Sequence, residues 1–127
     1  MNTDEQRSEL NKITEFVIGC AMTVSNTLGC GFLEKVYENA IAVELRRAEL
    51  KVEQQRELLV HYTGVLVGSF AMDLVIEDRV IVELKAVEAI CDAHVAQCLN
   101  YLRAAELPVC LLLNFGSPRL EVRRFVR

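Results

Sequence analysis

The sequence predicts a single α/β domain in which a mixed β-sheet is flanked by helices, in the order ααβββαββ. Apolar residues recur every three or four positions before residue 48 and form short β-branched runs after residue 49. Near the C-terminus a further helical segment separates two such runs, as in a βαβ unit. The length of 127 residues is that of one domain with its own hydrophobic core.

Two amphipathic helices are expected first. One runs from about Ser8 to Leu28, with its apolar residues on one stripe. Gly29-Cys30-Gly31 ends it, because glycine tolerates a sharp backbone turn. The other runs from about Leu33 to Ala48, and the short turn between the two helices indicates that they are neighbours in space.

Five strands and a third helix are expected in the rest of the chain. Thr63-Gly64 between two apolar runs is a hairpin signal, and Glu77-Asp78-Arg79 is a second tight turn. A continuous apolar run after Pro108 is typical of a strand covered on both faces. The predicted strands are Leu58–Tyr62, Val65–Ile76, Val80–Lys85, Val109–Phe115 and Leu120–Val126, with a helix over Asp92–Ala105.

The composition favours a folded cytoplasmic protein. Hydrophobic residues make up 52% of the chain and only two residues are proline, which argues against disorder. No apolar window is long enough to span a membrane, and the polar start is unlike a signal peptide. Five cysteines, an odd number without a CxxC pair, fit a reducing compartment. The apolar surplus in so short a chain hints at a homodimer.

The charge pattern limits the classes of nucleic-acid protein. A net charge of −4 argues against a nucleic-acid coat protein, which would be basic. The negative charge is compatible with a nuclease, because a carboxylate-rich site for a divalent cation adds acidic residues. The basic residues that crowd the C-terminus either contact phosphates or, more commonly, form a solvated strand end; they are Arg119, Arg123, Arg124 and Arg127.

The candidate site consists of charged residues within strands that should be buried. Glu83 and Lys85 lie on one face of their strand because side chains alternate. Pairing this strand with the preceding one places Asp73 across from Glu83. Converging carboxylates repel each other, and a hard cation such as Mg²⁺ relieves that repulsion, while an ammonium group orients water or stabilises developing charge. Spacing alone leaves an equal alternative, a solvated hairpin face with ion pairs.

Ordered motifs in this sequence resemble those of a known superfamily. Asp73 followed by Glu83-Leu84-Lys85 resembles the D…(D/E)xK signature of the PD-(D/E)XK nucleases. Gly68 before Asp73 is similar to the GxxxxD element of its exonuclease-like branch. Gln97 and Tyr101 on the next helix are similar to the QxxxY element of that branch. The resemblance implies a restriction-endonuclease-like core.

A narrower resemblance covers nearly the whole chain. Gly31-Phe32-Leu33-Glu34-Lys35-Val36-Tyr37 matches the motif of the small GxxExxY proteins, and similarity extends to Arg124. Within this motif we expect Tyr37 to pack rather than to catalyse. Members of that family commonly carry a histidine near the end of the first helix. Ser25 stands there in this chain, so any chemistry of that histidine is missing.

The resemblance also implies the roles of the site residues. It implies a nuclease that depends on Mg²⁺ or Mn²⁺ and hydrolyses phosphodiester bonds of nucleic acid, DNA rather than RNA. The implied metal ligands are Asp73, Glu83, the carbonyl of Leu84 and, directly or through water, Glu34. The implied catalytic residues are Asp73, Glu83, Lys85 and Glu34. The implied role of Gln97 and Tyr101 is to position Lys85 or a substrate phosphate. Spacing alone would make Glu34 an exposed helix residue and the Gln97–Tyr101 pair a polar helix edge.

Two other functions stay open at this point. One is a non-catalytic module that binds nucleic acid or protein and retains the nuclease fold; the complete acidic motif counts against it. The other is a structural subunit without a ligand. Two further motifs are set aside: Gly29-x-Gly31 follows a helix rather than a strand, unlike a dinucleotide loop. Cys91-x-x-His94-x-x-x-Cys98 lacks a fourth zinc ligand.

Overall fold

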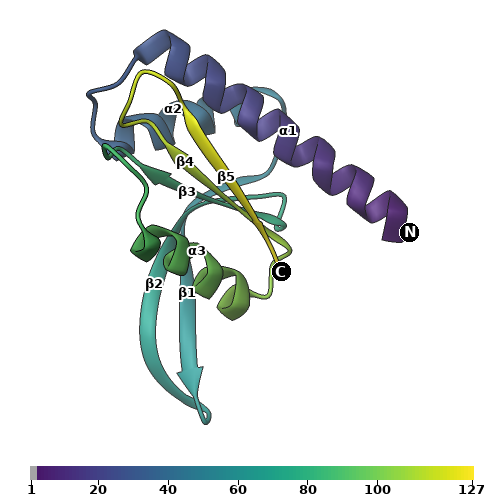
Figure 1. Ribbon diagram of the computed structural model, residues 1–127. Coiled ribbons are helices and arrows are strands. Elements are labelled where there is room, and N and C mark those ends of the chain that lie inside the picture. The colour runs from purple at the N-terminus through teal and green to yellow at the C-terminus, as the bar shows by residue number, and fades with distance from the viewer. Residues whose placement is uncertain (1–2) are drawn as a thin grey trace.

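The computed structural model describes residues 3–127 and has the predicted order of elements, ααβββαββ. Its strands form one sheet in the order β1-β2-β3-β4-β5, in which β3 and β4 are parallel and the other pairs are antiparallel (Figure 1). The predicted mixed sheet is confirmed. The elements are α1 (Thr3–Leu28), α2 (Glu34–Arg47), β1 (Val52–Tyr62), β2 (Val65–Ile76), β3 (Val80–Lys85), α3 (Asp92–Ala105), β4 (Val109–Asn114) and β5 (Glu121–Val126).

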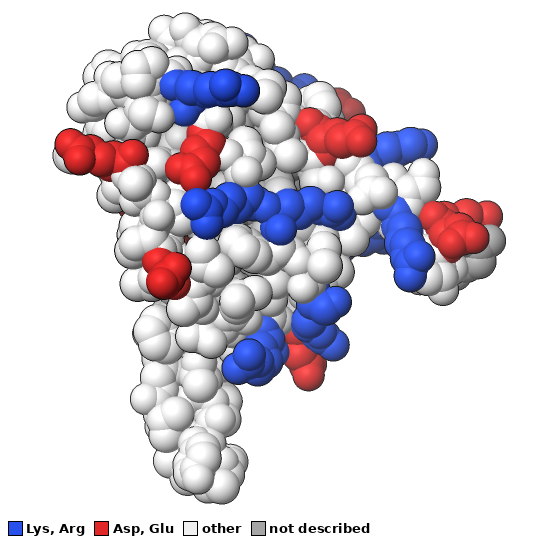
Figure 2. All heavy atoms as spheres, viewed as in Figure 1, with Lys and Arg blue, Asp and Glu red and all other residues white. Residues whose placement is uncertain are grey.

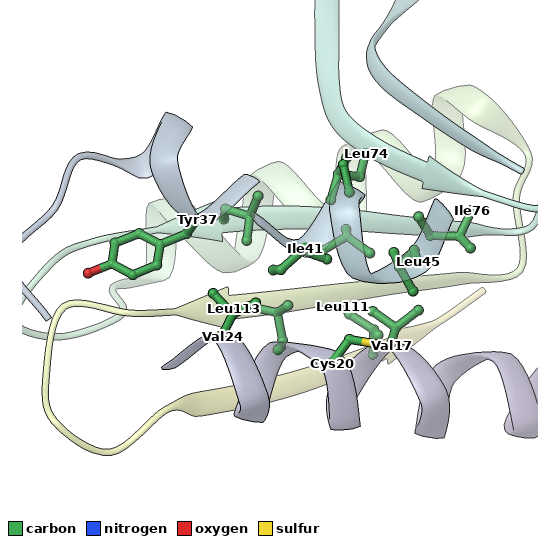
Figure 3. Packing of buried hydrophobic residues seen from close by; sticks show 14 of the residues in the cluster. Val17, Cys20, Val24, Tyr37, Ile41, Leu45, Leu74, Ile76, Leu111 and Leu113 are labelled. Carbon is green, nitrogen blue, oxygen red and sulfur yellow. The ribbon is translucent and has the colours of Figure 1, made fainter. Parts of the chain in front are cut away.

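Helices cover both faces of the sheet, and each face has its own core. On one face α1 and α2 pack together on the central strands, as Val17, Ile41 and Leu111 show (Figure 3). On the other face α3 packs through Cys98 and Leu102. Every residue of β4 is buried, as expected for a central strand with helices on both sides. Within residues 3–127 no helix has the length and apolar character of a membrane span.

Two predicted starts are wrong by five residues or more, both in polar segments, and predicted bounds of α2, β4 and β5 differ from the structure by one residue. Helix α1 begins at Thr3 rather than at Ser8, since its first turns are polar and carry no apolar stripe. Acidic residues there interact favourably with the helix dipole. Strand β1 begins at Val52 rather than at Leu58. It is an edge strand, and such strands carry polar and charged residues that hide the apolar alternation.

The hairpin of β1 and β2 is longer than the sheet to which it belongs. Strand β1 pairs with β2 along its whole length, whereas β3 pairs with β2 only over Leu74–Ile76. The remainder projects from the body as a curved two-stranded ribbon (Figure 1). We call residues Leu59–Ala71 the arm. The candidate site lies where the arm leaves the sheet.

Candidate active site

Strands β2 and β3 separate at Asp73 and Glu83. The last ladder pair before this point is Leu74 with Val82. Beyond it, side chains take the place of ladder partners. The amide of Asp73 donates to Glu83 Oε2 at 2.8 Å, and the amide of Leu84 donates to Asp73 Oδ2 at 2.9 Å. The structure thus brings the two carboxylates together at the register that the turn after β2 predicts.

The two carboxylates are held close together in a poorly solvated place. Glu83 is 2% exposed, and burial followed by the negative charge of Asp73 raises its pKa to about 8. Burial also raises the pKa of Asp73, and the negative charge of Glu38 adds to the shift. The amide of Leu84 opposes it by stabilising the ionised form. A bound cation would remove the repulsion between these groups.

Glu38 on α2 is a third carboxylate near the site, and it is not among the site residues predicted from the sequence. It is 3% exposed and accepts hydrogen bonds from Gln54 Nε2 and Gln55 Nε2, each at 2.7 Å. Lys35 Nζ lies 3.1 Å from it. Gln55 Nε2 also donates to Asp73 Oδ1 at 3.3 Å, so a single amide group bridges the two acids.

The sequence does carry a signal for Glu38. It lies three residues before Ile41 and seven before Leu45, so it interrupts the buried stripe of α2. A charged residue on such a stripe requires partners, because an unpaired buried charge is strongly destabilising. The partner Gln55 has a positive φ of 54°, a conformation that non-glycine residues rarely adopt and that concentrates at functional sites.

Lys85 lies beside this group, whereas no hydrogen bond or ion pair within residues 3–127 joins Glu34 to it. Lys85 is partly buried at the end of β3. Its positive charge opposes, without cancelling, the rise in the pKa of Asp73 and of Glu83. Glu34 is exposed at the first position of α2, where it lines a hollow of about 550 Å³ together with Ala86 and other residues. Glu38, rather than Glu34, is linked to Asp73 by hydrogen bonds through Gln55.

Gln97 and Tyr101 lie on α3 and line the groove between this helix and the hairpin of β1 and β2. Gln97 Nε2 donates to the hydroxyl of Tyr101 at 3.2 Å. Burial and then the negative charge of Glu83 raise the pKa of Tyr101, which places its hydroxyl within the field of that carboxylate. Gln97 Oε1 is buried, and no donor among residues 3–127 reaches it. A buried acceptor without a donor is uncommon, so this oxygen is available to a further donor.

A family model for the PD-(D/E)XK nuclease superfamily matches residues 11–125. The chain belongs to the PD-(D/E)XK nuclease superfamily. The match extends from α1 into β5 and includes Asp73, Glu83 and Lys85. No curated protein and no solved structure matches the chain. Membership in this superfamily suggests nuclease activity, which is phosphodiesterase chemistry on nucleic acid, and agrees with the restriction-endonuclease-like arrangement of the sheet.

The donor set at the superfamily's acidic motif fits Mg²⁺. This ion keeps several waters and takes only one or two protein carboxylates. Asp73 and Glu83 supply two, and the backbone at Leu84 adjoins both. Within residues 3–127 no group of three or more His, Cys, Asp or Glu side chains is arranged to enclose a metal ion. An Mg²⁺ ion held by two carboxylates would keep positions for water and substrate.

The loop that follows β3 is fastened by Asn114, a role that the sequence did not reveal. Asn114 is 1% exposed, and its side chain exchanges two hydrogen bonds of 3.0 Å with the backbone of Val87. The amide of Phe115 donates to the carbonyl of Lys85 at 2.8 Å. A Cβ atom at Gly116 would lie 1.9 Å from the carbonyl oxygen of Val87, so only glycine fits there. These contacts fix the end of β3, and with it Lys85.

Tyr37 has a structural role, as the sequence predicts. Its hydroxyl donates to the carbonyl of Gly29 at 2.6 Å and accepts from the amide of Phe32 at 3.2 Å. Its ring is fully buried and stacks on Phe115, with ring centroids 4.5 Å apart. The residue thus ties the turn between α1 and α2 to the core. Ser25, at the position of the missing histidine, is buried in α1.

Other charged and polar candidates have structural partners. Arg123 forms an ion pair with Glu121 at 3.1 Å, and Arg124 donates to Asn11 Oδ1 at 2.9 Å. Both lie on β5, at the opposite edge of the sheet from the arm. The amide of Cys91 donates to His94 Nδ1 at 3.1 Å, so these two residues cap the start of α3.

Proposed function

We propose that this protein is a Mg²⁺-dependent nuclease of the GxxExxY type that hydrolyses phosphodiester bonds of DNA. The observation that supports this most directly is the contact between Asp73 and Glu83 where β2 and β3 separate, with Lys85 on the same strand face as Glu83. Superfamily membership supports the wider class of nucleic-acid hydrolysis. Five free cysteines, three of them buried, support a reducing, cytoplasmic setting.

In this proposal Asp73, Glu83 and the carbonyl of Leu84 hold the metal ion, and Glu34 serves as an accessory acid. When bound, Mg²⁺ or Mn²⁺ supplies positive charge that activates water and stabilises the negative charge that develops on the phosphate. The hydrogen bonds from backbone amides to Asp73 and Glu83 keep both carboxylates in place before the ion arrives. Glu38 acts through Gln55 as a positioning residue for Asp73.

The remaining residues act on the water and the substrate. Lys85 donates either to the attacking water, which it orients, or to a phosphate oxygen that gains charge during the reaction. The unpartnered Gln97 Oε1 supports a role in holding that lysine or water. Tyr101 in turn accepts from the other end of the same amide, so it orients Gln97.

Cleavage assays test the proposal. We expect the wild type to cut DNA only with Mg²⁺ or Mn²⁺, and Asp73→Asn, Glu83→Gln and Lys85→Ala each to lose on the order of 100-fold or more of the rate. Glu15→Gln is the matched control, because Glu15 is exposed on α1 and lies outside the site. An active Glu83→Gln or Lys85→Ala protein would refute the assignment, and faster cleavage of RNA would change the substrate.

The alternative, a binding module that keeps the fold without catalysis, has one observation in its favour. Asp73 and Glu83 both accept backbone amides, so they also serve as substitutes for strand pairing. A thermal melt with increasing Mg²⁺ or Mn²⁺ separates the two functions. Stabilisation that Asp73→Asn abolishes supports the metal site, whereas no response to either ion supports the binding module.

A further inference from the structure

The arm has the surface of an interface rather than of a solvated hairpin. No Asp, Glu, Lys or Arg occurs between Leu58 and Met72, and Figure 2 shows the projecting arm without charged side chains. Its large apolar side chains are between 44% and 71% exposed; they are Leu59, Tyr62, Val65, Leu66, Val67 and Phe70. We propose that the arm is a dimerisation surface, on which the arm of a second copy of this chain packs about a two-fold axis.

The exposed area fits what a dimer requires. The accessible surface of 7453 Å² exceeds the roughly 6800 Å² expected for a compact monomer of 14.3 kDa. The apolar side chains of the arm expose together on the order of 600 Å², which is at the upper end of the range for the largest apolar patch on a monomer. A stable interface buries about 800 Å² on each partner, so the arm supplies most of one side. A two-stranded ribbon is also marginally stable in water by itself.

The residue types of the arm indicate what kind of molecule binds to it. Nucleic acid is held largely through basic side chains on its phosphates, and the arm has no lysine or arginine. The occupant must therefore be apolar. It must also offer an extended strand, since β1 is an edge strand with a neighbour on one side only. A second copy of β1 meets both requirements.

An antiparallel pairing of two β1 strands also sets complementary side chains opposite each other. With Leu59 at the two-fold axis, Glu57 of one copy lies opposite the partner's His61, and the reverse pair repeats across the axis. Both residues are exposed in the monomer, and a ring N–H of His61 can donate to the carboxylate of Glu57. Cross-strand pairs of this kind favour this register over others.

A groove of about 860 Å³ lies between the root of the arm and α3, with Val60 and Phe70 on one wall and Gln97 and Tyr101 on the other. With Leu59 on the two-fold axis, the partner's arm runs along the free edge of β1, so this groove stays outside the proposed contact.

The test is the mass of the full chain in solution, measured by light scattering after size exclusion across the micromolar range. We expect twice 14.3 kDa for the wild type and 14.3 kDa for Leu59→Lys, which sets two ammonium groups against each other at the two-fold axis. The matched control is Val43→Lys, which adds the same charge to an exposed valine on α2 and should stay dimeric. Circular dichroism checks that both variants fold, which their exposure favours.

Hydrogen exchange gives a second measurement that needs no variant. Amides of residues 58–62 should gain protection as the wild-type concentration rises, while those of β5, the other edge strand, should not. A monomeric wild type at all concentrations would overturn the proposal, as would a Leu59→Lys protein that stays dimeric. Monomeric wild type that sediments with neutral phosphatidylcholine vesicles would assign the arm to lipid instead. None of these outcomes depends on cleavage activity.

Discussion

Glu83 accepts the backbone amide of Asp73 at 2.8 Å, so one candidate metal ligand is held by the main chain of the other. The reverse contact runs from the amide of Leu84 to Asp73 Oδ2 at 2.9 Å. Movement of either residue therefore moves the other. The pair behaves as one unit, and its protonation affects the stability of the fold.

The metal-free protein should lose stability as the pH rises. Burial and the charge of Asp73 raise the pKa of Glu83 from 4.5 to about 8, so the folded state binds this proton more tightly than the unfolded state. The resulting stabilisation is complete below the unfolded pKa and disappears as the pH rises through the folded pKa. It amounts to at most about 5 kcal/mol.

Denaturant unfolding in a chelator, repeated at several pH values across this window, measures the effect. Glu83→Gln removes the titrating group and should flatten the profile while it keeps the amide hydrogen bond to the side-chain oxygen. An unchanged profile in this variant would assign the pH dependence to other groups.

Glu38 and Glu34 should give opposite results when each is changed. Glu38→Ala removes one acceptor from each of the Gln54 and Gln55 amides, which keep only Asn39 Oδ1 and Asp73 Oδ1, and should cost about 2–4 kcal/mol of unfolding free energy. Glu38→Gln keeps an acceptor oxygen and should recover part of this loss. Cleavage should fall in both, because Gln55 also contacts Asp73.

Glu34→Gln is the counterpart on the surface of the same helix. Since Glu34 is exposed, the change should alter stability by less than about 0.5 kcal/mol. If Glu34 is the accessory acid, cleavage falls while the melting temperature stays. Full activity of Glu34→Gln beside a defect in Glu38→Gln would transfer the accessory role to Glu38.

Gly116→Ala should destabilise the protein strongly. The new Cβ would lie 1.9 Å from the carbonyl oxygen of Val87, a backbone atom that cannot move without breaking its bond to Asn114. We expect a loss on the order of 3 kcal/mol by thermal unfolding. Gly19→Ala is the matched control, because it lies within α1 with no atom within 4 Å of the new Cβ, and it should stabilise the helix by about 0.5–1 kcal/mol. Equal effects of the two changes would contradict this assignment.

Tyr37→Phe should affect stability and leave catalysis intact. It removes the hydroxyl that joins Gly29 to Phe32, at a cost of about 1–3 kcal/mol. The ring keeps its stacking on Phe115. We therefore expect a lower melting temperature with an unchanged kcat for cleavage below that temperature. A large loss of kcat in a folded Tyr37→Phe protein would give this tyrosine a catalytic role.

The sequence predicts best where local patterns decide the structure. The bounds of β2, β3 and α3 agree with the prediction because turn residues delimit each apolar run. The position of Asp73 across from Glu83 follows from the register of the turn between them. The start of β1 was wrong, because its polar first half pairs with β2 without any apolar alternation.

The rest of the site depends on contacts between distant parts of the chain. Glu38 is acceptable within the core only because Gln54 and Gln55 come from another element to bind it. The hydrogen bonds between Asn114 and Val87 join the end of β4 to the loop that precedes α3. Neither the helical pattern around Glu38 nor the apolar run of β4 contains information about these partners.

The hydrogen bond between Asp73 and Glu83 spans ten residues, whereas that between Val87 and Asn114 spans 27. Short loops close at a smaller cost in chain entropy, and local contacts form early in folding. The acidic half of the site can therefore assemble as soon as its hairpin forms. We therefore expect the segment that carries Lys85 to reach its final place after α3 and β4 have docked, in a second and later step.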